Sequence, residues 1–117
     1  MFFVTFVLQT IKSTHKIKMR NILVIGAGRS CSSLIQYLLE KSSQEQLFIT
    51  VADISLENAR ELIGHHPNAG ALKFDVFNEE QRQTEIEKAD IVISMLPARF
   101  HMEVAKDCLK FGRNSVV

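Results

Sequence analysis

The feature that most constrains this chain is a regular alternation of short apolar runs and segments with helical periodicity, which extends from Met19 onward. The expected strands cover residues 21–25, 47–52, 71–74, 90–94 and 115–117. The clearest helical face contains Cys31, Leu34, Ile35, Leu38 and Leu39. Short connections join these elements, which is typical of right-handed βαβ units. We therefore expect an α/β fold with a doubly wound parallel sheet of about five strands, truncated at its last strand.

Length and charge narrow the classes of protein to which the chain can belong. Its 117 residues suffice for one compact domain, and the 46% of apolar residues can fill a core. The formal net charge is only +1, so the basic excess of a nucleic-acid-binding protein is missing and we expect no nucleic-acid partner.

The two cysteines show no metal-binding spacing. Cys31 and Cys108 both lie inside apolar helical patterns, and Cys108 shares one apolar face with Val104, Ala105 and Leu109. We expect both thiols to be small buried side chains, which suits a reducing, cytoplasmic location.

Residues 1–18 differ in character from the rest of the chain. The apolar run over residues 1–11 is too short to span a bilayer, and basic residues follow it, whereas in a signal peptide they precede it. Because Met19 stands directly before the first expected strand, we interpret residues 1–18 as an upstream extension and 19–117 as the domain. A membrane-associating helix and an added strand are the alternatives for the extension; for the domain we expect no membrane partner.

The first expected strand ends in the motif GAGRSC, which starts at Gly26. In dinucleotide-binding folds of the Rossmann type, the first glycine permits a tight turn and the second, here Gly28, lets the backbone approach a pyrophosphate. The third glycine, which allows close helix packing, is replaced by Cys31. The amides of Arg29, Ser30 and Cys31 are expected to point at the phosphates from the helix N-terminus. The alternative is a plain strand–helix turn without a ligand.

Asp53 and Ile54 follow the second expected strand. Asp53 stands at about the distance beyond the glycines at which Rossmann folds carry an acidic residue for the adenosine ribose hydroxyls. This carboxylate would repel the additional phosphate of NADP, and the nearest basic residue in sequence is Arg60. We therefore expect NAD as the cofactor, with NADP as the alternative. A role for Asp53 as a helix cap is also open.

The third and fourth expected strands are followed by two further candidate loops. Asp75 and Val76 are expected beside the adenine, with Asp75 bonding its amino group and Val76 packing on the ring; helix capping is the alternative role for Asp75. Met95, Leu96 and Pro97 follow the fourth strand, next to the point where the strand order should reverse. We expect that loop to pass near the pyrophosphate and the nicotinamide ribose.

Histidines provide little support for catalysis or metal binding. His101 is an acid–base group by type, but in the first turn of a helix it is more typical of a polar surface. His65 and His66 end a helix just before Pro67, and no third ligand accompanies them, so we expect no metal site. The catalytic residues are not assigned from the sequence.

The segments VIGAGRSCSSLIQYLLE, VADIS and ADIVISMLPARFHMEVAKDCLKFGRNSVV resemble the N-terminal domain of the saccharopine dehydrogenase (saccharopine reductase) family. The resemblance covers residues 20–117, and its most specific part is a leucine-proline loop before a helix of the form H-x-x-V-A-x-x-C. It implies a nicotinamide-dependent oxidoreductase that acts at a C–N bond of an amino-acid-derived amine such as saccharopine. By position, it implies that the glycine turn holds the pyrophosphate and that Asp53 binds the adenosine ribose. It also implies that the loop of Leu96 and Pro97 lies at the nicotinamide and its ribose.

The resemblance leaves open how the chain works. Since the family's substrate domain is not among these residues, we expect a cofactor-binding part that is not a complete catalyst, with a small amino-acid-like substrate held elsewhere. The alternatives are a stand-alone nucleotide-sensing Rossmann module that binds NAD or ADP-ribose, and a ligand-free scaffold. An incomplete sheet would also expose its last strand, which would permit a homodimer.

Overall fold

The computed structural model describes residues 19–26, 28 and 31–116, so the expected extension over residues 1–18 lies outside the described residues. The strands are β1 (Arg20–Ile25), β2 (Leu47–Asp53), β3 (Ala69–Lys73), β4 (Ile91–Ser94) and β5 (Asn114–Val116). They form one sheet in the order β3-β2-β1-β4-β5, and every neighbouring pair is parallel. This arrangement confirms the expected doubly wound α/β fold of the Rossmann type.

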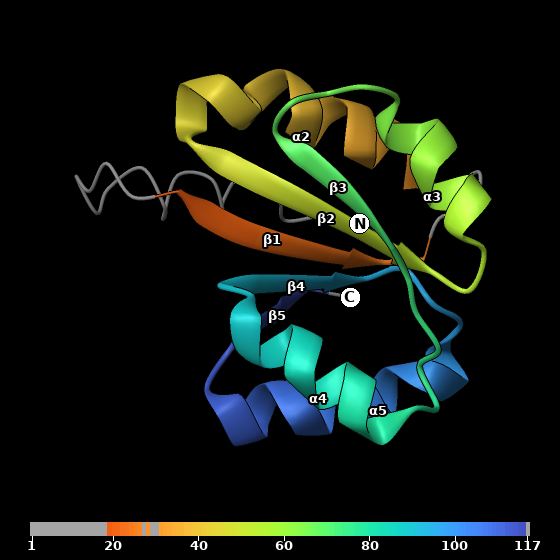
Figure 1. The fold of residues 1–117 in the computed structure, drawn as a ribbon. Helices are drawn as coiled ribbons and strands as arrows, with labels where there is room; N and C mark the ends of the chain where they lie inside the picture. The colour runs from red at the N-terminus through yellow and green to blue at the C-terminus, as the bar shows by residue number, and fades with distance from the viewer. Residues whose placement is uncertain (1–18, 27, 29–30, 117) are drawn as a thin grey trace.

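Two helices cover each face of the sheet (Figure 1). The helices α2 (Ser32–Glu45) and α3 (Leu56–Ile63) lie on one face, and α4 (Glu79–Lys88) and α5 (Ala98–Phe111) lie on the other. Residues 22–25 of β1 are buried in succession, because this central strand has helices on both sides. A continuous apolar run, rather than an alternating one, is what such a position requires.

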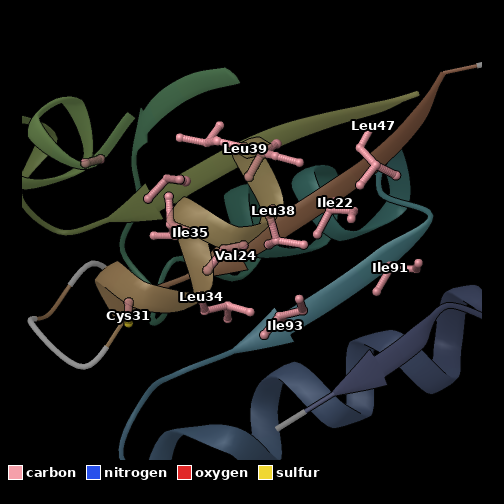
Figure 2. Packing of buried hydrophobic residues seen from close by; sticks show 13 residues of the cluster. Ile22, Val24, Cys31, Leu34, Ile35, Leu38, Leu39, Leu47, Ile91 and Ile93 are labelled. Atoms are coloured by element: carbon pink, nitrogen blue, oxygen red, sulfur yellow. The ribbon is translucent and has the colours of Figure 1, made fainter. Parts of the chain in front are cut away.

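The larger hydrophobic cluster lies between α2 and the sheet. Cys31 and the stripe of α2 formed by Leu34, Ile35, Leu38 and Leu39 are buried, as the helical periodicity predicts. These side chains pack against buried residues of β1 and β4, including Val24 and Ile93 (Figure 2). Full burial of one such aliphatic side chain is worth about 1.5–3 kcal/mol, so this face contributes much of the stability.

A smaller cluster fills the opposite face. There Leu23 and Ile25 of β1 meet Ile86 of α4 and Val104 and Cys108 of α5. Burial of both cysteines confirms their interpretation as small core residues. No helix in the described part of the chain is long and apolar enough to cross a membrane.

Several details of the expected elements are wrong. The strand β3 begins at Ala69 and ends at Lys73, not at 71 and 74, because pairing with β2 starts where Ile49 faces Ala69. The last strand, β5, begins at Asn114 and not at Ser115, and the expected last residue, Val117, lies outside the described residues. Leu109 is 84% exposed, although periodicity placed it on the apolar face of α5.

Leucines on α2 and α5 provide a direct test of this packing. Leu38→Ala should lower the free energy of unfolding by about 2–5 kcal/mol, because Leu38 is fully buried between α2 and the sheet. The matched control Leu109→Ala should change it by less than about 0.5 kcal/mol. Urea unfolding followed by circular dichroism measures both. Equal losses in the two variants would contradict this description of the core.

Candidate functional site

A cavity of about 260 Å³ opens at the edge of the sheet where the parallel strands end. Its lining comes from β1, β2, the segment after β3 and the segment from β4 into α5. The lining residues are Ile25, Gly26, Ala52, Asp53, Ile54, Phe74, Asp75, Val76, Phe77, Leu96 and Phe100. Six of the expected site residues therefore meet at one cavity: Gly26, Asp53, Ile54, Asp75, Val76 and Leu96.

The turn after β1 begins at Gly26, which has a φ angle of 108°. L-residues with a side chain rarely adopt this angle, so the turn requires glycine. The Gly26 N–H donates to the carbonyl of Ala52 at 2.7 Å, which ties the turn to the end of β2. At Gly28, no described atom lies within 4 Å of the place that a Cβ would occupy, so this side of the backbone is accessible.

Cys31 stands where the glycine motif would have its third glycine. Its side chain is 1% exposed and belongs to the cluster beneath α2, so it fits the close contact between helix and sheet. The Cys31 N–H donates to the carbonyl of Gly28 at 2.9 Å, and in this conformation the amide is engaged within the turn. The amides of Arg29 and Ser30 lie outside the described residues, so the expected phosphate cradle stays a prediction.

Asp53 is half-buried at the end of β2 and lines the cavity. One carboxylate oxygen, Oδ2, accepts the N–H of Ser55 at 2.8 Å, which holds the side chain in place. The N-cap of α3 is Ser55, whose hydroxyl accepts the N–H of Asn58. Asp53 is therefore not the N-cap of this helix. Ile54 is 62% exposed beside this carboxylate and offers no positive charge.

The segment after β3 turns sharply along the cavity. The Phe74 N–H donates to the carbonyl of Asp53 at 2.7 Å, and Asp75 Oδ1 accepts the N–H of Phe77 at 3.0 Å. Asn78 is the N-cap of α4, so Asp75 shapes the turn and does not cap the helix. The turn presents both Val76 and Phe77 to the cavity.

Two phenylalanines of the cavity were missed by reasoning from the sequence. Phe77 and Phe100 meet edge to face with ring centroids 5.1 Å apart, and the guanidinium of Arg99 lies 4.8 Å from the Phe100 ring centroid. Phe77 is 68% exposed, which is unusual for so large an apolar side chain. For Phe77, its position shortly after a strand end could have pointed to the cavity. Nothing in the sequence around Phe100 gives a comparable indication.

The loop between β4 and α5 contributes unequally to the cavity. Leu96 lines it, whereas Met95 packs against the larger core cluster and lies 3.5 Å from the place that a Cβ at Gly26 would occupy. Pro97 is the N-cap residue of α5 and is exposed. Of the three expected residues, therefore, only Leu96 faces this cavity.

A polar contact joins the end of β4 to the first turns of α5. Ser94 is buried, and its hydroxyl lies 2.8 Å from Nδ1 of the half-buried His101. His101 is thus more than a polar surface residue, because it satisfies a buried hydroxyl next to the Met95 loop. Within the described ranges, no group of three or more potential metal ligands is present.

The lining determines what this cavity can bind. It combines an aliphatic and aromatic wall with two carboxylates, that of Asp53 at the end of β2 beside a glycine turn and that of Asp75 after β3. Such a surface suits a flat heterocycle attached to a sugar, with the sugar hydroxyls donating to the Asp53 carboxylate.

Known proteins share this sequence pattern. The family described as saccharopine dehydrogenase NADP binding domain matches residues 22–116. Saccharopine dehydrogenase [NADP(+), L-glutamate-forming] from Schizosaccharomyces pombe is 31% identical over 96 residues, which are 82% of this chain and 21% of that protein. Alpha-aminoadipic semialdehyde synthase from Arabidopsis thaliana is 28% identical over 116 residues, which cover 85% of this chain and 11% of that protein.

Solved structures agree with the sequence comparison. Apo saccharopine dehydrogenase (L-Glu forming) from Saccharomyces cerevisiae superposes with a TM-score of 0.72 at 25% identity, over 82% of this chain and 21% of that one. The chain thus spans about a fifth of this protein and of the S. pombe relative. It belongs to the saccharopine dehydrogenase family and corresponds to the nicotinamide-dinucleotide-binding domain of that family.

Proposed function

We propose that this chain binds a nicotinamide dinucleotide at the cavity and serves as the cofactor-binding part of an oxidoreductase that acts on a C–N bond of an amino acid derivative such as saccharopine. The observation that carries the proposal is the position of Asp53. Its carboxylate lies at the end of β2, on the wall of an otherwise mainly apolar cavity that also includes the Gly26 turn. Ligands of doubly wound folds bind at this edge, where the strand order reverses.

In the proposed binding mode, each part of the cofactor has a matching group of residues. The adenine packs on Val76 and Phe100, near enough to Asp75 for a bond from its amino group. The ribose hydroxyls donate to Asp53. The pyrophosphate would lie along the backbone at Gly26 and Gly28, beside Arg29, Ser30 and Cys31, of which Arg29 and Ser30 lie outside the described residues. The nicotinamide ribose would lie toward the loop of Met95, Leu96 and Pro97, where Leu96 lines the cavity.

The chain's own residues bind and orient the cofactor, which supplies the hydride-transfer chemistry when bound. The contact between the Ser94 hydroxyl and His101 Nδ1 joins the two ends of the loop that carries Leu96. Since the chain corresponds to about a fifth of its relative from S. pombe, we propose that other residues of a longer protein hold the substrate and that the 117 residues alone do not catalyse its oxidation.

The proposed cofactor is NAD rather than NADP. The matching family is described as NADP binding, and the relatives with a printed specificity are named as NADP(+) enzymes. The preference for NAD rests on this chain's own residues, namely the Asp53 carboxylate at the proposed ribose position and the uncharged, exposed side chain of Ile54. The additional phosphate of NADP on this ribose would lie close to the Asp53 carboxylate, and the two negative charges would repel each other.

The first prediction concerns binding by the chain itself. In calorimetric titrations, NAD and ADP-ribose should bind, and NADP should bind about tenfold more weakly, which corresponds to about 1.4 kcal/mol. Binding of neither NAD nor ADP-ribose would refute the proposed site. Tighter binding of NADP would refute the cofactor preference alone.

The second prediction isolates the charge of Asp53. Asp53→Asn retains an oxygen that can accept the Ser55 N–H but removes the repulsion, so the NAD-to-NADP affinity ratio should fall toward one. Asp90→Asn is the matched control, because Asp90 Oδ2 also accepts a backbone N–H, from Asn21 at 2.8 Å, at the opposite edge of the sheet. An unchanged ratio in Asp53→Asn, or an equal change in both variants, would contradict the role of Asp53.

The third prediction addresses the enzymatic part of the proposal. A longer protein that contains this domain should reduce NAD when saccharopine is added, as followed by the absorbance of NADH. The 117-residue chain alone should bind NAD without this reaction. Binding without saccharopine-dependent reduction by the longer protein would leave the domain a cofactor-binding module and refute the proposed substrate class.

A further inference from the structure

We propose that Arg82, held by Asp107, is a positioning residue for the adenine half of the cofactor site. Arg82 is not among the residues that line the cavity beside Asp53, and in this proposal it acts through the carbonyl of Val76. This inference rests on the proposed function, because the role given to the buried pair of Arg82 and Asp107 depends on a dinucleotide binding in the cavity.

The guanidinium of Arg82 connects helices α4 and α5 with the turn after β3 that lines the cavity. Arg82 lies on α4 and Asp107 on α5, and both are buried, with exposed fractions of 5% and 4%. Arg82 Nε donates to Asp107 Oδ2, and Arg82 Nη1 donates to the carbonyl oxygen of Val76 at 2.7 Å. Val76 in turn lines the cavity. A continuous chain of contacts therefore joins α5 to the expected adenine wall.

Neighbouring polar groups fix the orientation of this pair. Gln83 Nε2 donates to Asp107 Oδ1 at 3.3 Å, so both carboxylate oxygens of Asp107 are engaged. Arg82 Nη2 lies 3.7 Å from Glu103 Oε1, at the solvent side of the pair. The Arg82 guanidinium thus has only a narrow range of orientations, which suits a group that must hold a backbone carbonyl in place.

Stability alone gives a weak reason for such a pair. Desolvation offsets much of the attraction between buried charges, and replacement of both by apolar residues is often neutral or stabilising. A planar guanidinium can, however, donate in two fixed directions at once, here to a carboxylate and to a turn carbonyl, which a lysine ammonium does less well. The geometry is therefore better explained by a requirement to place the turn.

The turn that Arg82 holds forms part of the cavity wall. Val76 and Phe77 both line it, and Phe77 reaches across to Phe100 at the start of α5. Loss of the bond to the Val76 carbonyl would release this wall from one side. Because the net effect of one such hydrogen bond with a charged donor is modest, we expect ADP-ribose affinity to fall about tenfold.

The test compares ADP-ribose affinity with thermal stability in variants of the full 117-residue chain. The double variant Arg82→Met with Asp107→Leu replaces the pair by apolar side chains, and it should unfold near the wild-type temperature yet bind ADP-ribose about tenfold more weakly. Arg82→Lys should also bind about tenfold more weakly. Asp107→Asn retains an acceptor for Arg82 and should bind nearly as wild type. Lys88→Met, which breaks the pair of the exposed Lys88 with Glu85 on the same helix, is the control and should leave affinity unchanged.

The outcomes separate this inference from the proposed function. If the folded double variant binds ADP-ribose as tightly as wild type, the positioning role is overturned while the binding site stands. If the double variant does not fold, Arg82→Lys decides: weaker binding by the folded protein supports the role, and wild-type binding overturns it. Failure of the wild-type chain to bind ADP-ribose would refute the proposed function itself.

Discussion

The constraint on which the rest of the structure depends is the position of β1 at the centre of a parallel sheet. It pairs with β2 on one side and β4 on the other, so Ile25 has both Ala52 and Ser94 as neighbours. Parallel strands require crossovers, and here the crossovers on the two sides of β1 lie on opposite faces. Neither crossover covers the end of β1, which is why the turn at Gly26 and the cavity beside it remain accessible.

Much of this arrangement is predictable from the sequence, for a physical reason. Strands buried on both faces need continuous apolar runs, and residues 22–25 and 91–93 provide them. The same rule places Asp53, a strand-end residue, at the correct edge of the sheet. It fails for β3, because Ala69 and Gly70 have little strand propensity and only their pairing with β2 makes them part of the sheet. Periodicity likewise does not reveal that Leu109 lies beyond the reach of the sheet.

The contacts that complete the site were not predictable, because they join distant segments. Arg82 stands in a helix of almost entirely polar sequence and resembles a surface residue until α5 packs against it. Phe77 and Phe100 are separated by a strand and a helix, and His101 meets Ser94 across a loop. Local patterns locate the ends of strands, whereas the packing of α4 on α5 decides which side chains meet there.

If Arg82 positions the turn at Val76 for a ligand, as we propose, their hydrogen bond also connects ligand occupancy with the energetics of folding. The face covered by α4 and α5 has the smaller of the two hydrophobic clusters, and its buried charges add little net stability. A ligand that binds only the folded state adds about 2.7 kcal/mol at one hundred times its Kd. Saturation with a dinucleotide would therefore raise the free energy of unfolding and offset the smaller apolar cluster on this face. Local opening of α4 and α5 would then be rarest when the dinucleotide is abundant.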